Sequence, residues 1–153
     1  MQPRLNPYQA APETVKAVVA LEEHLANSGL ERSLYHLVKT RASQINGCAY
    51  CVHMHTRDAR AHGETEERLY LLSAWRESPL YSDRERAALA WTDALTLIAD
   101  TGAPDEAYEE VKRHFTEAEI VKLTILIGTI NLWNRLTVSM RSVHPVTKSQ
   151  AAQ

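Results

Sequence analysis

The two cysteines of the chain stand in a single Cys-x-x-Cys unit, Cys48 and Cys51, and His55 follows four residues later. If a helix begins at about Cys48, both thiols lie in its first turn, where free backbone N–H groups and the positive end of the helix dipole favour thiolate. All three side chains would then share one face of that helix. Two thiols at this spacing can close a reversible disulfide, and the histidine can accept or return a proton. The pattern predicts a compact redox site.

Two other interpretations of the cysteines stay open. Reduced cysteines also serve as small apolar core residues. Zinc is a second candidate, because Cys48, Cys51, His53 and His55 are all zinc-binding types, but on one helix the two histidines point about 200° apart at ~3.6 residues per turn. They cannot both join the cysteines around one ion. A zinc site that recruits His36 or a second subunit is still an alternative.

Helical signals surround this site, and no segment alternates in the manner of a β-strand. Asn46 and Gly47 interrupt one helix just before Cys48, and Ser82 and Thr116 each begin a capping-box pattern that opens another. We expect an all-α domain of about six or seven helices. The expected helices cover about residues 15–29, 30–45, 48–63, 64–75, 82–101, 104–114 and 116–143.

The last of these helices is apolar on most of its circumference, which predicts a central position or burial against another subunit. Asn131, Asn134 and Arg135 are polar exceptions on it, and we expect them to hydrogen-bond inside the fold or across an interface. We expect the three tryptophans to anchor the core or a subunit interface, with Trp133 the one candidate for a pocket wall. In the helix expected over residues 82–101, residues such as Ile98 should point inward.

The composition limits the class of protein. The chain has 153 residues, of which 44% are hydrophobic and 24% charged, and this predicts one globular domain over residues 1–153. A net charge of −2 gives no basic surface for nucleic acid. The most apolar run, at 123–133, is shorter than the ~20 residues that cross a bilayer, so no membrane partner is expected. The absence of a secretory signal and of multiple disulfides predicts a cytoplasmic protein.

The segment Ser43–Cys51 (SQINGCAYC), followed by His55, resembles the core motif of the alkylhydroperoxidase D-like (AhpD-like) branch of the carboxymuconolactone decarboxylase superfamily. The later segment Ile130–Arg135 (INLWNR) resembles the second recurrent motif of that family. Together with Trp75 and the helix order, the resemblance covers about residues 30–143. It implies an all-α fold, homo-oligomers that are often trimers or hexamers, and thiol-based reduction of a small hydroperoxide.

By position, the resemblance implies that Cys51 attacks the peroxide, Cys48 resolves the intermediate and His55 relays protons. The family pattern places a glutamate twelve residues before the first cysteine, and here that residue is His36. An imidazole can still accept a proton, but its unperturbed pKa is ~6.5 and it brings no negative charge. We therefore count His36 among the candidate catalytic residues. Tyr50 also stands where the best-characterised hydroperoxidases have a histidine.

The expected reaction is a thiol peroxidase cycle without cofactor or metal. Cys51 becomes a sulfenic acid, Cys48 condenses with it to a disulfide, and a dithiol reductant, either a protein or a lipoyl-type group, restores both thiols. The reductant should attack the more exposed sulfur, which we expect to be Cys48 at the helix tip. Two alternatives stay open: a redox-sensing oligomeric scaffold without turnover, and an acid–base decarboxylase or isomerase that uses His36, His53 and His55.

Overall fold

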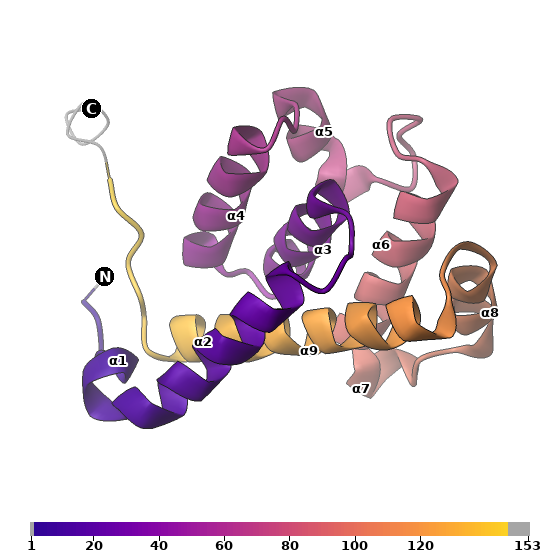
Figure 1. The fold of residues 1–153 in the computed structure, drawn as a ribbon. Coiled ribbons are helices and arrows are strands. Elements are labelled where there is room, and N and C mark those ends of the chain that lie inside the picture. Colours follow the sequence, from indigo (N-terminus) through magenta and orange to yellow (C-terminus); the bar gives the residue numbers. More distant parts are fainter. Residues whose placement is uncertain (1, 147–153) are drawn as a thin grey trace.

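The computed structural model describes residues 2–146, and over that range the chain is helical with no β-strand (Figure 1). The all-α prediction is confirmed, but nine α-helices and one 3₁₀ helix in the described range exceed the expected six or seven. None of these helices is both long and apolar enough to cross a membrane. In chain order they are α1 (Pro7–Ala10), α2 (Pro12–Ala26), α3 (Arg32–Ile45), α4 (Ala49–Ala61), α5 (Glu66–Leu71), the 3₁₀ helix η1 (Leu72–Ala74), α6 (Asp83–Thr96), α7 (Ile98–Thr101), α8 (Asp105–His114) and α9 (Glu117–Ser139).

One additional helix, α1, lies before the first expected helix, and the others arise where an expected helix is divided. The helix that begins after Ser82 stops at Thr96, because Leu97 leaves the helical conformation (φ −103°, ψ 32°) before α7 begins. Ile98 is consequently 54% exposed, and the prediction that it points inward is wrong. The helix expected over 64–75 is likewise divided into α5 and η1.

Two further helix ends also differ from expectation. Pro104 is the N-cap residue of α8 rather than its first helical residue. The last helix ends at Ser139 instead of near Val143, and Arg141 then adopts a left-handed backbone conformation (φ 54°). By contrast, the two predicted capping boxes are present at the starts of α6 and α9, where each cap hydroxyl and its glutamate satisfy backbone N–H groups reciprocally.

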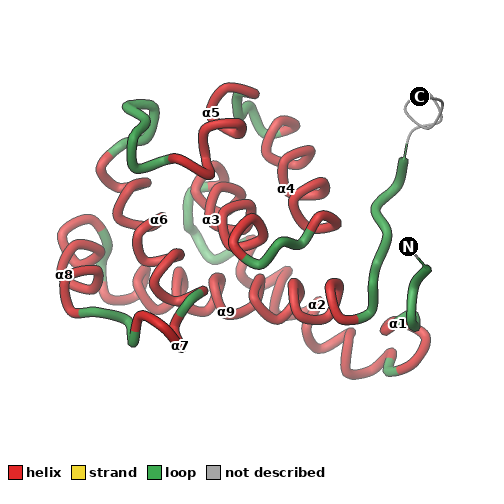
Figure 2. Tube along the Cα trace, turned by 180° about the vertical axis from the view of Figure 1, so that it is seen from behind, coloured by secondary structure: helices red, strands yellow, loops and turns green. Residues whose placement is uncertain are grey.

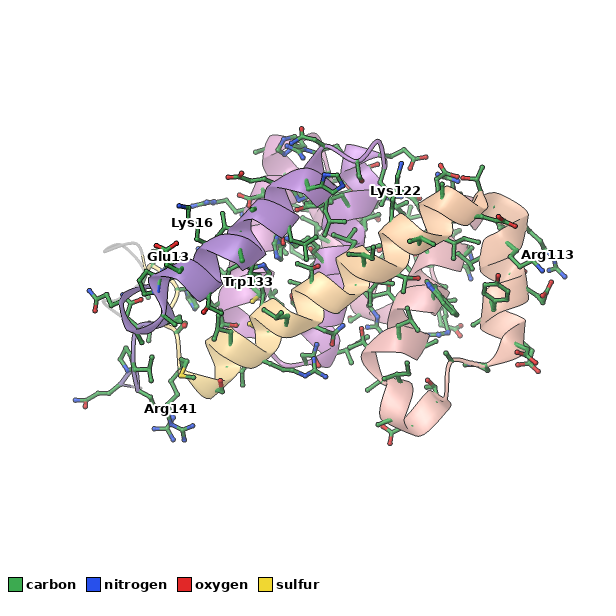
Figure 3. The ribbon with its side chains drawn as sticks, turned by 60° about the horizontal axis from the view of Figure 1, so that its bottom comes forward. Glu13, Lys16, Arg113, Lys122, Trp133 and Arg141 are labelled. Carbon is green, nitrogen blue, oxygen red and sulfur yellow. The ribbon has the colours of Figure 1, made fainter. Side chains whose placement is uncertain are left out.

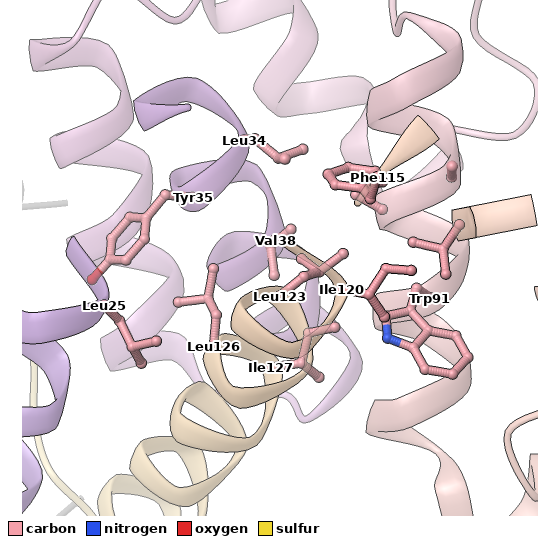
Figure 4. Packing of buried hydrophobic residues seen from close by; sticks show 13 residues of the cluster. Leu25, Leu34, Tyr35, Val38, Trp91, Phe115, Ile120, Leu123, Leu126 and Ile127 are labelled. Carbon is pink, nitrogen blue, oxygen red and sulfur yellow. The ribbon is translucent and has the colours of Figure 1, made fainter. Parts of the chain in front are cut away.

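Helix α3 is the most enclosed element of the fold. It packs against α4, α6 and α9, and α2 lies across α9 (Figures 1 and 2). Even polar side chains of α3, such as His36, Lys39 and Ser43, are buried. The main core lies between α2, α3, α6, α8 and α9 (Figure 4), and it is formed by Leu25, Leu34, Tyr35, Val38, Ala87, Ala88, Trp91, Val111, Phe115, Ile120, Leu123, Leu126 and Ile127.

Helix α9 buries one side and exposes another. Leu123, Ile127 and Ile130 face the interior, whereas an apolar stripe on the opposite side is open in the single chain. The helix packs against α2, α3, α4, α6 and α8, in agreement with the predicted central position, but these neighbours do not cover the stripe. The exposed residues of the stripe are Val121, Ile125 and Leu132.

A hydrogen-bond network joins the loop before α4 to α9. Asn46 Nδ2 donates to Asn131 Oδ1 at 3.0 Å and to Asn134 Oδ1 at 2.9 Å, and Asn134 Nδ2 donates to Ser43 Oγ at 3.0 Å. Arg135 donates to the Asn131 backbone carbonyl at 3.0 Å. The prediction that these polar residues of α9 bond inside the fold is confirmed. The network fixes the end of α3 against α9 at the point where α4 must begin.

Asn134→Ala should destabilise the protein by about 2 kcal/mol or more, because it removes two buried hydrogen bonds and leaves Asn46 and Ser43 with fewer partners. Urea unfolding followed by circular dichroism measures the change. Asn27→Ala is the control: the Asn27 side chain is exposed and its one hydrogen bond is to the Glu23 carbonyl, so the substitution should stay within about 0.5 kcal/mol of wild type. Equal midpoints for the two variants would contradict a structural role for the network.

Candidate functional site

The turn between α3 and α4 sets the position of both cysteines. Gly47 has φ +63°, a left-handed conformation that glycine adopts without the steric cost of a Cβ. Cys48 is the N-cap residue of α4, and its Sγ accepts a hydrogen bond from the Cys51 backbone N–H at 3.3 Å. The predicted placement of both thiols in the first turn of a helix is confirmed.

The two thiols form a buried pair. Cys48 and Cys51 are both free and each is 1% exposed, with their Sγ atoms 2.7 Å apart. Thr137 Oγ1 lies 3.0 Å from the Cys48 sulfur and 3.3 Å from the Cys51 sulfur. The prediction that Cys48 is the more exposed sulfur is wrong, because the N-cap position turns its side chain back over the helix end and against α9.

The thiol pair shares a proton. The hydrogen bond between the two sulfurs, together with Thr137 and the Cys51 N–H, lowers the pKa of Cys48 to about 6 against the opposing effect of burial. The same bond, together with burial, raises the pKa of Cys51. The pair therefore carries one negative charge at neutral pH and holds one proton between its two sulfurs.

A pocket of about 550 Å³ opens beside Cys51, and Cys48 does not line it. Its walls come from α2, α3, α4, α9 and the N-terminal segment around Leu5, which is held by a hydrogen bond from Arg4 N–H to the Met140 carbonyl at 3.0 Å. Its apolar wall includes Leu5, Tyr8, Val19, Met54, Trp133 and Leu136. Its polar groups include Glu22, Lys39, Cys51, His55 and Thr137.

His55 reaches this pocket one helical turn after Cys51. It is 3% exposed, and neither ring nitrogen has a hydrogen-bond partner among the described residues. Burial, with the nearby charge of Lys39 and the proximity of His36, lowers the pKa of His55 well below its ordinary value. The imidazole is therefore neutral at pH 7 and can accept a proton within the pocket.

His36 lies on a different cavity. It lines a second pocket of about 280 Å³ together with His62, whose ring centroid is 4.9 Å from its own. Burial first, and then the charges of His62 and Arg32, lower the pKa of His36 to about 4. The structure thus brings His55 and Cys51 to one pocket and places His36 on another.

The remaining candidate ligands do not converge on an ion. His53 stacks on His144 with ring centroids 4.7 Å apart and is absent from the lining of the cysteine pocket, in agreement with its predicted direction away from the thiols. Across residues 2–146, no group of three or more His, Cys, Asp or Glu side chains is arranged to hold a metal. The zinc interpretation therefore has no ligand set in that range.

A partly buried ion pair on the pocket wall was not expected from the sequence. The Lys39 ammonium donates to Glu22 Oε1, the Tyr35 hydroxyl donates to the same oxygen, and Trp133 Nε1 donates to Glu22 Oε2 at 3.1 Å. Figure 3 shows Trp133 on the side of α9 that faces α2. The position of Glu22 could have indicated this pair. Glu22 follows the buried Val15 by seven residues, so its carboxylate lies on the apolar side of its helix.

The chain is similar to known proteins over most of its length. The model of the carboxymuconolactone decarboxylase family matches residues 12–94. The uncharacterized protein YdfG of Bacillus subtilis (strain 168) is 44% identical over 140 residues, which cover 92% of this chain and 95% of YdfG.

Two crystal structures extend this similarity. The first is a protein of unknown function from Agrobacterium tumefaciens, for which an AhpD role in antioxidant defence has been suggested. It is 53% identical to this chain with a TM-score of 0.94, and the match covers 95% of this chain and 100% of that chain. The debrominase Bmp8 is 20% identical with a TM-score of 0.78, over 90% of this chain and 74% of that chain, which shows a shared fold.

The ultraviolet absorbance of thiolate in the reduced, folded protein should titrate with a midpoint near pH 6, the lowered pKa of Cys48. In urea the midpoint should return to ~8.5, the ordinary value for cysteine. Cys51→Ala should raise the folded midpoint, because the S–H donor to Cys48 is lost. A folded wild-type protein that titrates above pH 8 would contradict the shared proton.

Proposed function

Because the chain belongs to the carboxymuconolactone decarboxylase family, we propose that it is a thiol-dependent peroxide reductase of the AhpD type. One observation carries the proposal: two buried thiols are hydrogen-bonded to each other, with their sulfurs 2.7 Å apart, and one of them, Cys51, forms part of the wall of a ligand-sized pocket. A thiolate is the form of cysteine that attacks peroxides, and a pair of neighbouring sulfurs can then close a disulfide.

In the first step the proton on Cys51 moves to the Cys48 sulfur, and the Cys51 thiolate attacks the outer oxygen of a hydroperoxide. A sulfur–oxygen bond forms and the oxygen–oxygen bond breaks, which leaves Cys51 as a sulfenic acid and releases an alkoxide. The alkoxide takes the proton from Cys48 and departs as an alcohol. His55, neutral and on the same pocket wall, is placed to relay this proton.

In the second step the Cys48 thiolate attacks the Cys51 sulfur. The sulfur–sulfur bond forms, the sulfur–oxygen bond breaks, and the departing hydroxide takes a proton from solvent to become water. We propose that His55 relays this proton from solvent and that His36 has a lesser, outer role in the relay, because it lines the second pocket. The peroxide is thereby reduced by two electrons and the thiol pair is oxidised.

The pocket indicates the kind of substrate and reductant. Its walls are largely apolar, its volume of about 550 Å³ far exceeds hydrogen peroxide, and the thiol pair adds a negative charge, so an uncharged organic hydroperoxide fits it best. The reductant must approach Cys51 through the same pocket, since both sulfurs are 1% exposed. We therefore propose a slender dithiol, such as a lipoyl-type arm, which attacks Cys51.

We also propose that the chain is a single domain with its core at about residues 30–143, and that it assembles into a homo-oligomer. The apolar stripe on α9 supports assembly, because exposed apolar patches on a helix are typical of subunit contacts. Copies of the same chain would cover Val121, Ile125 and Leu132.

An acid–base reaction is the second candidate function, because His55, Lys39 and Glu22 share the pocket with Cys51. Such a decarboxylase or isomerase reaction would need neither sulfur. Activity toward a pocket ligand that survives the loss of both thiols would favour it over peroxide reduction.

Cys51→Ser should lower hydroperoxide turnover by on the order of 10³-fold or more, because the nucleophile is lost. Cys48→Ser should react once per chain and then stop, because no disulfide can form. Stopped-flow mixing of each reduced variant with cumene hydroperoxide, with thiols counted before and after, measures both effects. Wild type should lose two thiols per chain.

His53→Ala is the matched control, since His53 lies outside the pocket and should keep wild-type turnover. Retained turnover in Cys51→Ser would overturn the proposed nucleophile. Oxidation of wild type without repeated turnover, in the presence of a dithiol that re-reduces it, would favour the redox-sensing scaffold.

His55→Gln should slow disulfide formation by about 10²-fold, the usual size of a lost proton-transfer group. His36→Gln should have a smaller effect, because the residue lines the second pocket. Single-turnover kinetics with the same hydroperoxide compare the two. A larger loss in His36→Gln than in His55→Gln would contradict the proposed order of the relay.

A further inference from the structure

Lys39 is a buried cation on the wall of the cysteine pocket. It is 3% exposed, and it comes from α3, the central helix. Burying an ammonium is costly unless it is paired and hydrogen-bonded. Here Glu22 from α2 supplies the pairing, and Tyr35 and Trp133 hold the Glu22 carboxylate from two further directions. Three helices therefore converge to fix one ammonium at this position.

Lys39 differs in charge from the other groups that line the pocket. Among the described residues that line the pocket, Lys39 is the only lysine or arginine, Glu22 and Glu23 are the carboxylates, and His55 is a neutral imidazole. The remaining charge is the single negative charge of the thiol pair. The start of α4, where the Cys51 N–H donates to the Cys48 sulfur, favours that charge on Cys48, whereas only Cys51 reaches the pocket.

We propose that Lys39, clamped by Glu22, is a positioning residue that draws the negative charge of the thiol pair onto Cys51, the sulfur that meets the substrate. The ammonium acts through space, because opposite charges attract over several ångströms inside a protein. Burial lowers the pKa of Lys39, while Glu22 first and then Cys51 act to raise it, so the Cys51 sulfur and the ammonium are close enough to interact. The inference rests on the proposed thiol chemistry, but it concerns only the ionisation of Cys51.

A purely structural ion pair would behave differently. If the pair only fastens α2 to α3, its loss lowers the stability of the fold and leaves the ionisation of a remaining cysteine unchanged. If Lys39 stabilises the thiolate, its loss raises the pKa of Cys51 even in a folded variant. The pKa of Cys51 therefore separates the two roles.

The experiment measures Cys51 alone, in a Cys48→Ser background. The rate of alkylation by iodoacetamide as a function of pH, followed by mass spectrometry of the Cys51 peptide, gives the pKa of this thiol. Adding Lys39→Met should raise it by about one unit or more and slow alkylation at pH 7 about 10-fold. Lys39→Arg, which keeps the charge, should restore most of the rate.

Lys16→Met is the matched control. Lys16 is exposed on α2 (Figure 3), so the same substitution removes one positive charge from the protein without touching the pocket. Its alkylation profile should equal that of the background. If Lys39→Met does not fold, Lys39→Gln replaces it, because its amide can still donate to Glu22 while the charge is gone.

An unchanged Cys51 pKa in a folded, charge-free variant would overturn the inference. Because alkylation needs no peroxide, the outcome is independent of the proposed function. A pKa shift without peroxide turnover in wild type supports the role of Lys39 and rejects the peroxidase proposal. Peroxide turnover in wild type without a Cys51 pKa shift in the Lys39 variants supports the peroxidase proposal and rejects the role of Lys39.

Discussion

Helix α4 begins directly after its N-cap residue Cys48, and this start determines the position of both sulfurs. Gly47 provides the left-handed turn (φ +63°), and the asparagine network of Asn46, Asn131 and Asn134 fixes that turn against α9. The N-cap position then lets the backbone N–H of Cys51 donate to the Cys48 sulfur. A start one residue earlier or later would turn one thiol away from the other. The chemistry of the pair thus depends on a helix boundary held by polar groups.

Because of where α4 starts, the two sulfurs have different roles. Cys48 is stabilised as a thiolate at the helix end, and Cys51 opens onto the pocket. The groups that complete the pocket come from elements distant in the chain: Glu22 from α2, Lys39 from α3 and Trp133 from α9. Because α3 is enclosed by its neighbours, its polar side chains are held rigidly and largely away from water. The pocket therefore combines apolar walls, which suit an uncharged substrate, with charged side chains in fixed positions, which suit an ionised thiol.

Features that depend on local sequence could be predicted. The capping boxes at Ser82 and Thr116, the turn at Gly47 and the shared face of Cys51 and His55 all follow from spacing within a few residues. Features that depend on tertiary packing could not. The break at Leu97 has no glycine or proline to signal it, and the pairing of Glu22 with Lys39 requires two helices to meet. The burial of Cys48 and the separate pocket of His36 likewise arise from the packing of α3, α4 and α9.

The central claim is that Cys51 is the sulfur that takes oxygen from the peroxide. Its most direct test is the site of sulfenic acid formation after one equivalent of an organic hydroperoxide, trapped with a dimedone probe and mapped by mass spectrometry. In the Cys48→Ser variant, the account predicts one adduct per chain on Cys51. In the Cys51→Ser variant it predicts almost none on Cys48. Equal or faster labelling of Cys48 would contradict the assignment of Cys51 as the nucleophile.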